Sequence, residues 1–273
     1  MEKKVILITG ASSGIGKATA EKLIKEGHSV YCAARRVEQM KDLENMGGHI
    51  LAMDVTNEEQ MISAVNQIIE ERGKIDVLFN NAGYAIYGAV EDTSIADARR
   101  QFDVNIFGLA RLTQLVLPHM RKQESGKIIN TSSMGGKIYT PLGAWYHATK
   151  HALEGWSDCL RLEVKQFGID VVLIEPGIIK TEFGDVMNTP MMERSGNGVY
   201  ANLAKSVEKA TTDSYEKGNS SPATVIANVV SKAINARKPK TRYAAGKLAK
   251  PLLFVRRYFS DRFFDRVVMS QVK

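Results

Sequence analysis

A tyrosine and a lysine at helical spacing, with a serine upstream, are the side chains of this sequence best suited to acid–base chemistry. Tyr146 and Lys150 stand four positions apart, and Ser133 precedes the tyrosine by thirteen. Residues i and i+4 of a helix share a face, so we expect the ammonium of Lys150 beside the phenol of Tyr146, where it would favour the ionised form. Such a tyrosine can give or take a proton near neutral pH.

The same spacing occurs a second time without a serine partner. Tyr243 and Lys247 are also four apart, but Gly246 interrupts a helix there, and the position thirteen before the tyrosine is Val230. Only the first pair therefore has the upstream serine that this chemistry needs.

Other residues near the first pair have simpler explanations. His147 and His151 each point one residue away from the Tyr146 face, so we expect packing or surface roles for them and not acid–base chemistry. No group of His, Cys or carboxylate residues has metal-ligand spacing, so we expect no catalytic metal.

The elements that must position these residues follow a regular rhythm. Short apolar runs, separated by stretches of helical length, predict strands at 5–9, 29–33, 50–53, 77–80, 127–131 and 171–175. Such alternation is typical of βαβ units, so we predict an α/β fold: a single-domain, Rossmann-like, doubly wound parallel sheet of about seven strands flanked by helices. Ligands bind these sheets at the carboxyl ends of the strands.

The later part of the chain departs from that rhythm. Ser221 and Pro222 have the residue types of an N-cap and a first helical position, which predicts a helix from there to about 236. The methionine-rich segment of about 183–220 is expected to be a mobile lid over a substrate, with an adaptable core patch as the alternative. We therefore divide the chain into a main α/β domain, 1–250, which carries the candidate catalytic residues, and a basic amphipathic C-terminal extension, 251–273.

A glycine-rich turn follows the first predicted strand and opens the first helix. It runs from Thr9 to Gly16 with glycines at 10, 14 and 16, which allow a pyrophosphate to approach the backbone and the helix N-terminus. At the end of the second strand stand Arg35 and Arg36, with no carboxylate before Glu38. Arginine there favours the 2′-phosphate of NADP, so we expect NADP(H), with NAD(H) as the alternative and Arg35 ranked ahead of Arg36.

Taken together, these motifs resemble the short-chain dehydrogenase/reductase family over about the first 185 residues. The pieces that match in order and spacing are the glycine turn, Asn80-Asn81-Ala82-Gly83, Asn105, Ser133, Tyr146, Lys150, and Pro176-Gly177 with Thr181. Segments 31–36, 115–121 and 174–177 look most like the branch related to 17β-hydroxysteroid dehydrogenases.

The resemblance implies four catalytic residues. Tyr146 would exchange the proton of a substrate hydroxyl while hydride passes between the substrate carbon and the nicotinamide. Ser133 would bind the substrate oxygen, and Lys150 would lower the pKa of Tyr146 and hold the nicotinamide ribose. Asn105 would hold a water that connects the lysine to solvent.

The resemblance also implies the cofactor contacts. The adenine would meet Asp54 and Val55, the adenosine ribose would lie along 81–83, and the carboxamide would meet Ile179 and Thr181. The full expected set is Gly10, Ser12, Ser13, Gly14, Ile15, Gly16, Arg35, Arg36, Asp54, Val55, Asn81, Ala82, Gly83, Tyr146, Lys150, Pro176, Gly177, Ile179 and Thr181.

The net charge of +7 comes from one end of the chain. Residues 237–273 hold eleven basic and two acidic residues, whereas the preceding 236 residues hold 26 basic and 28 acidic ones. The extension interleaves apolar and basic residues, as do helices that rest on anionic lipid. We favour the alternative, a helix packed on its own domain or across a subunit interface.

The expected function is therefore an NADP(H)-dependent oxidoreductase that interconverts a secondary alcohol and a ketone, on a lipophilic substrate of steroid or retinoid size. The alternative is an NADP(H)-binding regulator with little turnover. A nucleic-acid binder is disfavoured because the main domain is acidic and has no recognition motif. With two cysteines and no signal peptide we expect a cytoplasmic location. The family resemblance implies a homodimer or homotetramer, because the family commonly uses helices at the positions of 97–122 and 146–167 for its subunit contacts.

Overall fold

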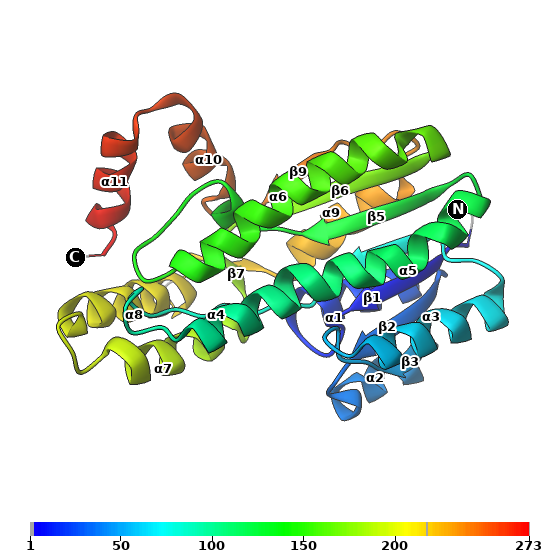
Figure 1. The fold of residues 1–273 in the computed structure, drawn as a ribbon, viewed down its shortest axis with the longest axis horizontal. Helices are drawn as coiled ribbons and strands as arrows, with labels where there is room; N and C mark the ends of the chain where they lie inside the picture. Colours follow the sequence, from blue (N-terminus) through cyan, green and yellow to red (C-terminus); the bar gives the residue numbers. More distant parts are fainter. Residues whose placement is uncertain (1–2, 217, 273) are drawn as a thin grey trace.

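The centre of the molecule is a sheet of seven parallel strands in the order β3-β2-β1-β4-β5-β6-β9 (Figure 1). The structure, a computed structural model, describes residues 3–216 and 218–272; four residues lie outside these ranges, namely Met1 and Glu2 of the predicted main domain, Lys217 of the predicted lid and Lys273 of the predicted extension. The strands are β1 Val5–Thr9, β2 Ser29–Ala34, β3 His49–Ala52, β4 Val77–Asn80, β5 Gly126–Thr131, β6 Ile169–Pro176 and β9 Arg242–Ala245. The prediction of a doubly wound parallel sheet is confirmed.

Helices cover both faces of this sheet. Residues of α3, α5 and α6 pack on one face, and residues of α1, α2 and α9 pack on the other. The helices are α1 Gly14–Lys25, α2 Lys41–Asn45, α3 Glu58–Arg72, α4 Ile95–Phe102, α5 Leu109–Lys122, α6 Ala144–Val164, α7 Phe183–Ser195, α8 Ala201–Glu216, α9 Thr224–Asn235, α10 Ala249–Tyr258 and α11 Asp261–Ser270. None of the helices in the described ranges is both long enough and apolar enough to cross a bilayer.

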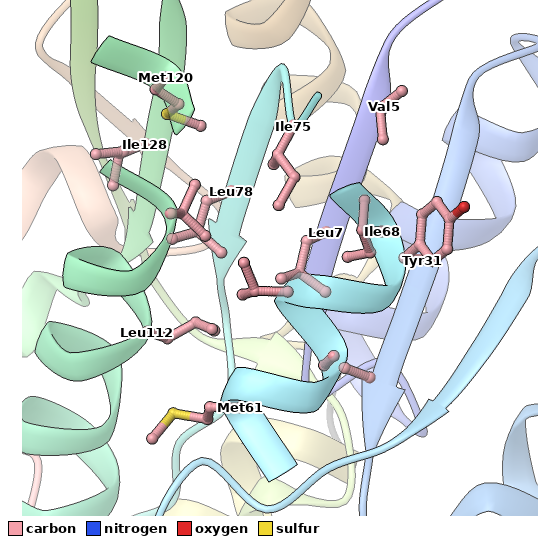
Figure 2. Packing of buried hydrophobic residues seen from close by; sticks show 14 of the residues in the cluster. Val5, Leu7, Tyr31, Met61, Ile68, Ile75, Leu78, Leu112, Met120 and Ile128 are labelled. Atoms are coloured by element: carbon pink, nitrogen blue, oxygen red, sulfur yellow. The ribbon is translucent and has the colours of Figure 1, made fainter. Parts of the chain in front are cut away.

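The central strands are apolar along their whole length because both of their faces are buried. Leu7 of β1, Leu78 of β4 and Ile128 of β5 are fully buried beneath α3 and α5 (Figure 2). Burying one such side chain contributes about 1.5–3 kcal/mol. This core holds the carboxyl ends of the strands, where the loops of the site begin, in fixed positions.

The order in which the chain adds strands to the sheet reverses between β1 and β4. The chain runs from β1 outward to β2 and β3, then returns to pair β4 on the other side of β1. At this switch point Thr9 Oγ1 accepts hydrogen bonds from the backbone N–H groups of Asn81 (3.0 Å) and Ala82 (2.9 Å). The loop after β4 is thereby fixed beside the glycine turn after β1, where a doubly wound sheet binds its ligand.

One predicted helix start is wrong. Ser221 and Pro222 form a short strand, β8 (Ser221–Pro222), which pairs with β7 (Ile179–Lys180), and the Ser221 N–H donates to the Ile178 carbonyl at 2.9 Å. The helix α9 begins at Thr224 instead. Pairing with a distant segment has outweighed the local capping preference.

The second tyrosine–lysine pair is not helical, as expected. Tyr243 lies on β9, and Gly246 has a φ of +91°, which ends the strand in a left-handed turn. Four-residue spacing in an extended segment does not bring Tyr243 and Lys247 onto one helical face.

Candidate active site

A cavity of about 650 Å³ opens at the carboxyl ends of the strands and collects nearly all of the predicted site. The predicted residues that line it are Gly10, Ser12, Ser13, Gly14, Ile15, Arg35, Arg36, Asp54, Val55, Asn81, Ala82, Gly83, Ser133, Tyr146, Lys150, Pro176, Gly177, Ile179 and Thr181. Gly16 and Asn105 are not among the lining residues. Residues from six different loops therefore meet in one space.

Tyr146 and Ser133 are joined at the inner end of this cavity. The first turn of α6 carries Tyr146, and the loop after β5 carries Ser133, whose Oγ also accepts a hydrogen bond from the Gly135 N–H at 2.9 Å. The two hydroxyls share a hydrogen bond. Burial raises the pKa of the Tyr146 phenol, and the bond with Ser133 opposes that rise. The phenol therefore holds its proton and can donate it to a substrate oxygen.

Lys150 lies one helical turn after Tyr146. Its Nζ donates to the Thr131 carbonyl at 2.8 Å and lies 6.0 Å from the centre of the Tyr146 ring. Burial lowers the pKa of Lys150 to about 8, an effect that Glu154 opposes. Burial of the phenol is the largest influence on the pKa of Tyr146 in this structure, so the predicted lowering of that pKa by Lys150 stays a prediction.

Asn105 has a bracing position and does not face the cavity. It lies on a π-helical turn, Asp103–Gly108, that joins α4 to α5. Its Nδ2 donates to the Tyr84 carbonyl (3.0 Å) and to Thr149 Oγ1 (3.1 Å), and its Oδ1 accepts from the Tyr84 N–H (3.2 Å). Asn105 thus ties the loop after β4 to α6, and π-helical turns are frequent at functional sites.

The backbone of the glycine turn packs so closely against neighbouring backbone that side chains larger than glycine would clash at two positions. Gly10 has a φ of +67°, and a Cβ there would lie 2.9 Å from the Ala82 Cα. A Cβ on Gly16 would lie 2.2 Å from the Gly10 carbonyl oxygen, so Gly16 serves close packing, and its predicted cofactor contact stays a prediction. The first turn of α1 holds no acidic residue, so its N-terminus is suited to an anionic pyrophosphate.

Two arginines border the turn on the solvent side. Arg36 Nη2 donates to Ser13 Oγ at 3.0 Å, and its Nη1 lies 3.6 Å from Glu182. Arg35 Nη1 lies 3.7 Å from Asp54 Oδ2 and its side chain is largely exposed. Both guanidinium groups fit a phosphate bound between the turn and the loop after β3.

His147 lines the cavity without the freedom to act as an acid or base. The Thr140 N–H donates to its Nε2 at 3.1 Å, and its Nδ1 lies 2.9 Å from the Gly135 carbonyl, which accepts from the remaining ring N–H. Burial lowers the pKa of His147, so the neutral ring is favoured. The packing role predicted for it agrees with this geometry.

Several cavity residues were not anticipated from the sequence. They come from the loop after β4 and from α7 and α8: Tyr84, Tyr87, Val186, Met187, Thr211, Ser214 and Tyr215. Tyr87 lies only four positions beyond Gly83, so proximity to that motif was a usable signal. The residues of α7 and α8 have no motif that marks them.

The methionines of α7 divide between the two predicted roles. Met191 is fully buried in a cluster that also contains Tyr87 and Tyr146, whereas Met187 belongs to the same cluster and lines the cavity. α7 therefore forms an apolar wall facing the phenol. Within residues 3–216 and 218–272, no three His, Cys, Asp or Glu side chains gather as a metal site.

Comparison with known proteins agrees with this geometry. Residues 4–191 match the family model for short chain dehydrogenases. The chain is 40% identical to a 3-ketodihydrosphingosine reductase of Bacteroides thetaiotaomicron, over 92% of this chain and 91% of that protein. It is 34% identical to an NADPH-dependent 3-dehydrocapnine reductase of Ornithobacterium rhinotracheale, over 98% and 96%.

A solved structure shows the same architecture. A short-chain dehydrogenase from Streptomyces avermitilis superposes with a TM-score of 0.79 at 33% identity, covering 99% of this chain and 95% of that one. Sequence, fold and the arrangement of Ser133, Tyr146 and Lys150 agree, and the chain belongs to the short-chain dehydrogenase/reductase family of oxidoreductases that act on CH–OH groups with NAD or NADP.

Proposed function

We propose that this protein reduces a ketone of a lipophilic substrate to a secondary alcohol, with NADPH as the hydride donor. The observation that carries the proposal is the buried, hydrogen-bonded pair of Ser133 and Tyr146 in one cavity with the glycine turn and its two arginines. A protonated phenol is the state that reduction requires, because the carbonyl oxygen must gain a proton.

The lipophilic character rests on the wall opposite the phenol. Met187 and Val186 of α7 and Tyr215 of α8 line that side of the cavity. The names of two relatives, a 3-ketodihydrosphingosine reductase and a 3-dehydrocapnine reductase, point to the reduction of keto compounds. We therefore place 3-ketodihydrosphingosine beside steroid and retinoid ketones as candidate substrates.

In the proposed mechanism the chain's own residues orient and protonate the ketone. NADPH, when bound, supplies the hydride that adds to the carbonyl carbon. Ser133 donates a hydrogen bond to the carbonyl oxygen and stabilises its growing negative charge. Tyr146 gives its hydroxyl proton to that oxygen, and Lys150 and Thr131 hold the adjoining wall by their 2.8 Å hydrogen bond. The products are the alcohol and NADP⁺, and solvent returns one proton to Tyr146.

The preference for NADP(H) is supported by Arg35 and Arg36 at the end of β2 and by the NADPH dependence named for one relative. The two cysteines, Cys32 and Cys159, are both free thiols, in agreement with the proposed cytoplasmic location. We also propose a homo-oligomer, because Phe107 and Leu162 leave large apolar side chains exposed near α5 and on α6.

The test is a Tyr146→Phe variant assayed with NADPH on a panel of ketones that includes 3-ketodihydrosphingosine, a steroid and a retinoid ketone. We expect turnover of the active ketone to fall about 10²- to 10⁴-fold because the proton donor is lost. NADPH affinity, measured by cofactor fluorescence, should stay within about twofold because the ring remains.

The chain supplies its own control in the second tyrosine–lysine pair. Tyr243→Phe removes the same hydroxyl at the same spacing from a lysine, and it should leave turnover unchanged. Full activity in Tyr146→Phe would remove this residue from the mechanism. NADPH binding without reduction of any ketone would favour the alternative, a regulatory protein with this fold.

A further inference from the structure

The two C-terminal helices, α10 and α11, have one side fixed to the protein. Phe264 of α11 is fully buried and meets the Tyr139 ring edge-on, with ring centres 5.2 Å apart. The Tyr139 hydroxyl donates to Asp265 at 2.9 Å, and Arg256 of α10 lies over both aromatic rings. The expected packing of the extension on its own domain is therefore observed, but only for this inner side.

The other side of the same hairpin is aromatic and exposed. Phe254 and Tyr258 of α10 are 58% and 63% exposed, and Phe259, directly after α10, and Phe263 of α11 are 46% and 38% exposed. Within each pair the residues are four positions apart and their ring centres lie 4.8 Å and 4.7 Å apart. Four aromatic side chains on one short hairpin are more than the isolated apolar residues that surfaces usually carry.

The same two helices carry exposed cations that have no acidic partner among the described residues. The exposed basic side chains are Lys250, Arg257, Arg262 and Arg266, and none of them forms an ion pair within the described part of the chain. The acidic residues of the hairpin are already engaged, since Asp261 pairs with Arg256 and Asp265 accepts from Tyr139. The outer side therefore combines aromatic rings with uncompensated positive charge.

We propose that this outer side docks on the surface of an anionic lipid bilayer. Aromatic rings are favoured at the headgroup boundary, and each arginine or lysine near an anionic surface adds attraction. Two helices of ten residues each are too short to span a bilayer, so the contact is peripheral. A two-fold contact with a second copy fits less well, because it would place one basic side against the same basic side.

The docked hairpin would lie near the helices that form the apolar wall of the cavity. α10 and α11 stand away from the sheet at the end of the molecule where α7 and α8 lie, and α11 runs back toward α8 (Figure 1). Val272 packs against the cluster that contains Met187 and Val207. A lipophilic ketone leaving the bilayer would then meet the apolar wall of α7; this consequence rests on the proposed function, whereas the docking itself does not.

The experiment is co-sedimentation of the full chain with vesicles of phosphatidylcholine and phosphatidylglycerol in equal parts, compared with vesicles of phosphatidylcholine alone. We expect binding to the mixed vesicles only, and weaker binding as salt is raised. A variant with Arg257→Gln, Arg262→Gln and Arg266→Gln should bind on the order of a hundredfold more weakly, because three attractive charges are lost. A second variant, Phe254→Ser with Phe263→Ser, should also lose binding at unchanged charge.

The matched control removes three exposed charges elsewhere, away from the segments expected to join subunits: Lys25→Gln, Lys232→Gln and Lys238→Gln. It has the same net charge as the arginine variant and should bind like the wild type. NADPH affinity, equal in all of these proteins, verifies that each is folded. Absence of binding by the wild type, equal binding by all variants, or a dimer that dissociates in the arginine variant would each overturn the proposal. Failure of the ketone assay with intact vesicle binding would overturn only the proposed function.

Discussion

Lys150 is a buried cation whose position works against the stability of the folded chain. Its pKa is lowered from 10.5 to about 8 by burial, so below pH 8 the folded protein holds an ammonium in an unfavourable environment. Between these two pKa values the unfolded chain binds more protons than the folded chain. The free energy of unfolding should therefore rise with pH across that window.

Replacing Lys150 by methionine should separate stability from activity. At neutral pH we expect Lys150→Met to increase the free energy of unfolding by about 2 kcal/mol, after allowing for the lost hydrogen bond to Thr131. We also expect it to abolish turnover, because methionine cannot make the hydrogen bonds to the nicotinamide ribose that we propose for Lys150. Urea unfolding followed by circular dichroism measures the first effect. Lys247→Met, an exposed lysine at the same spacing from a tyrosine, should change neither quantity, and a destabilised Lys150→Met would contradict the buried-charge argument.

Arg35 and Arg36 are the residues that we expect to determine the preference for NADPH over NADH. Arg35→Ala combined with Arg36→Ala should weaken NADPH binding about tenfold to a hundredfold by removing charged contacts to the 2′-phosphate, with little effect on NADH. Fluorescence titrations with both nucleotides test this, and Arg99→Ala on α4 is the exposed control. Equal losses for NADPH and NADH would show that the arginines do not read the phosphate.

The sequence predicted which residues meet better than it predicted their electrostatics. Spacing and order identified Ser133, Tyr146 and Lys150, because a helix and a loop after a strand fix their relative positions. Spacing could not show that Lys150 lies over the ring of Tyr146, or that the Thr140 N–H would donate a hydrogen bond to the His147 ring. Those outcomes depend on contacts between segments, which local patterns do not contain.

Among the elements, the glycine turn after β1 gives the sharpest prediction. Gly10 and Gly73 have nearly the same φ, +67° and +72°, but only Gly10 has a neighbour against which a Cβ would press, Ala82 at 2.9 Å. The left-handed backbone alone should cost alanine about 1 kcal/mol of unfolding free energy at either position, and Gly10→Ala should cost more because its Cβ presses on Ala82. Only Gly10→Ala should also lose NADPH affinity, measured by titration, and equal affinity in the two variants would show that the close approach is unimportant.

Strands and helices differed in how far local sequence determined them. Six strands followed from apolar runs, because strands buried on both faces must be apolar throughout. β9 was not recognised, since Arg242 and Tyr243 resemble a surface segment and become a strand only by pairing with Leu173 and Ile174 of β6. The misplaced start of α9 has the same cause.

At the scale of the whole molecule, the proposed homo-oligomer can be tested at the exposed apolar residues near α5 and on α6. Phe107 is 60% exposed and Leu162 is 72% exposed. A variant with Phe107→Ser and Leu162→Ser should sediment as a monomer of 30.2 kDa, while Val199→Ser, exposed between α7 and α8, should leave the assembly intact. A wild-type protein that is already monomeric would refute this interface.

Tyr139 and Thr140 are neighbours in the chain but connect the outside of the molecule with its interior. Tyr139 meets Phe264 and Asp265 of α11, and Thr140 meets His147 in the wall of the cavity. A protein shortened before α10 would lose both its lipid-facing side chains and the support of that wall. A substitution in α11 can therefore alter two properties at once. It can change the proposed contact with lipid, and it can change the shape of the cavity that would bind the ketone.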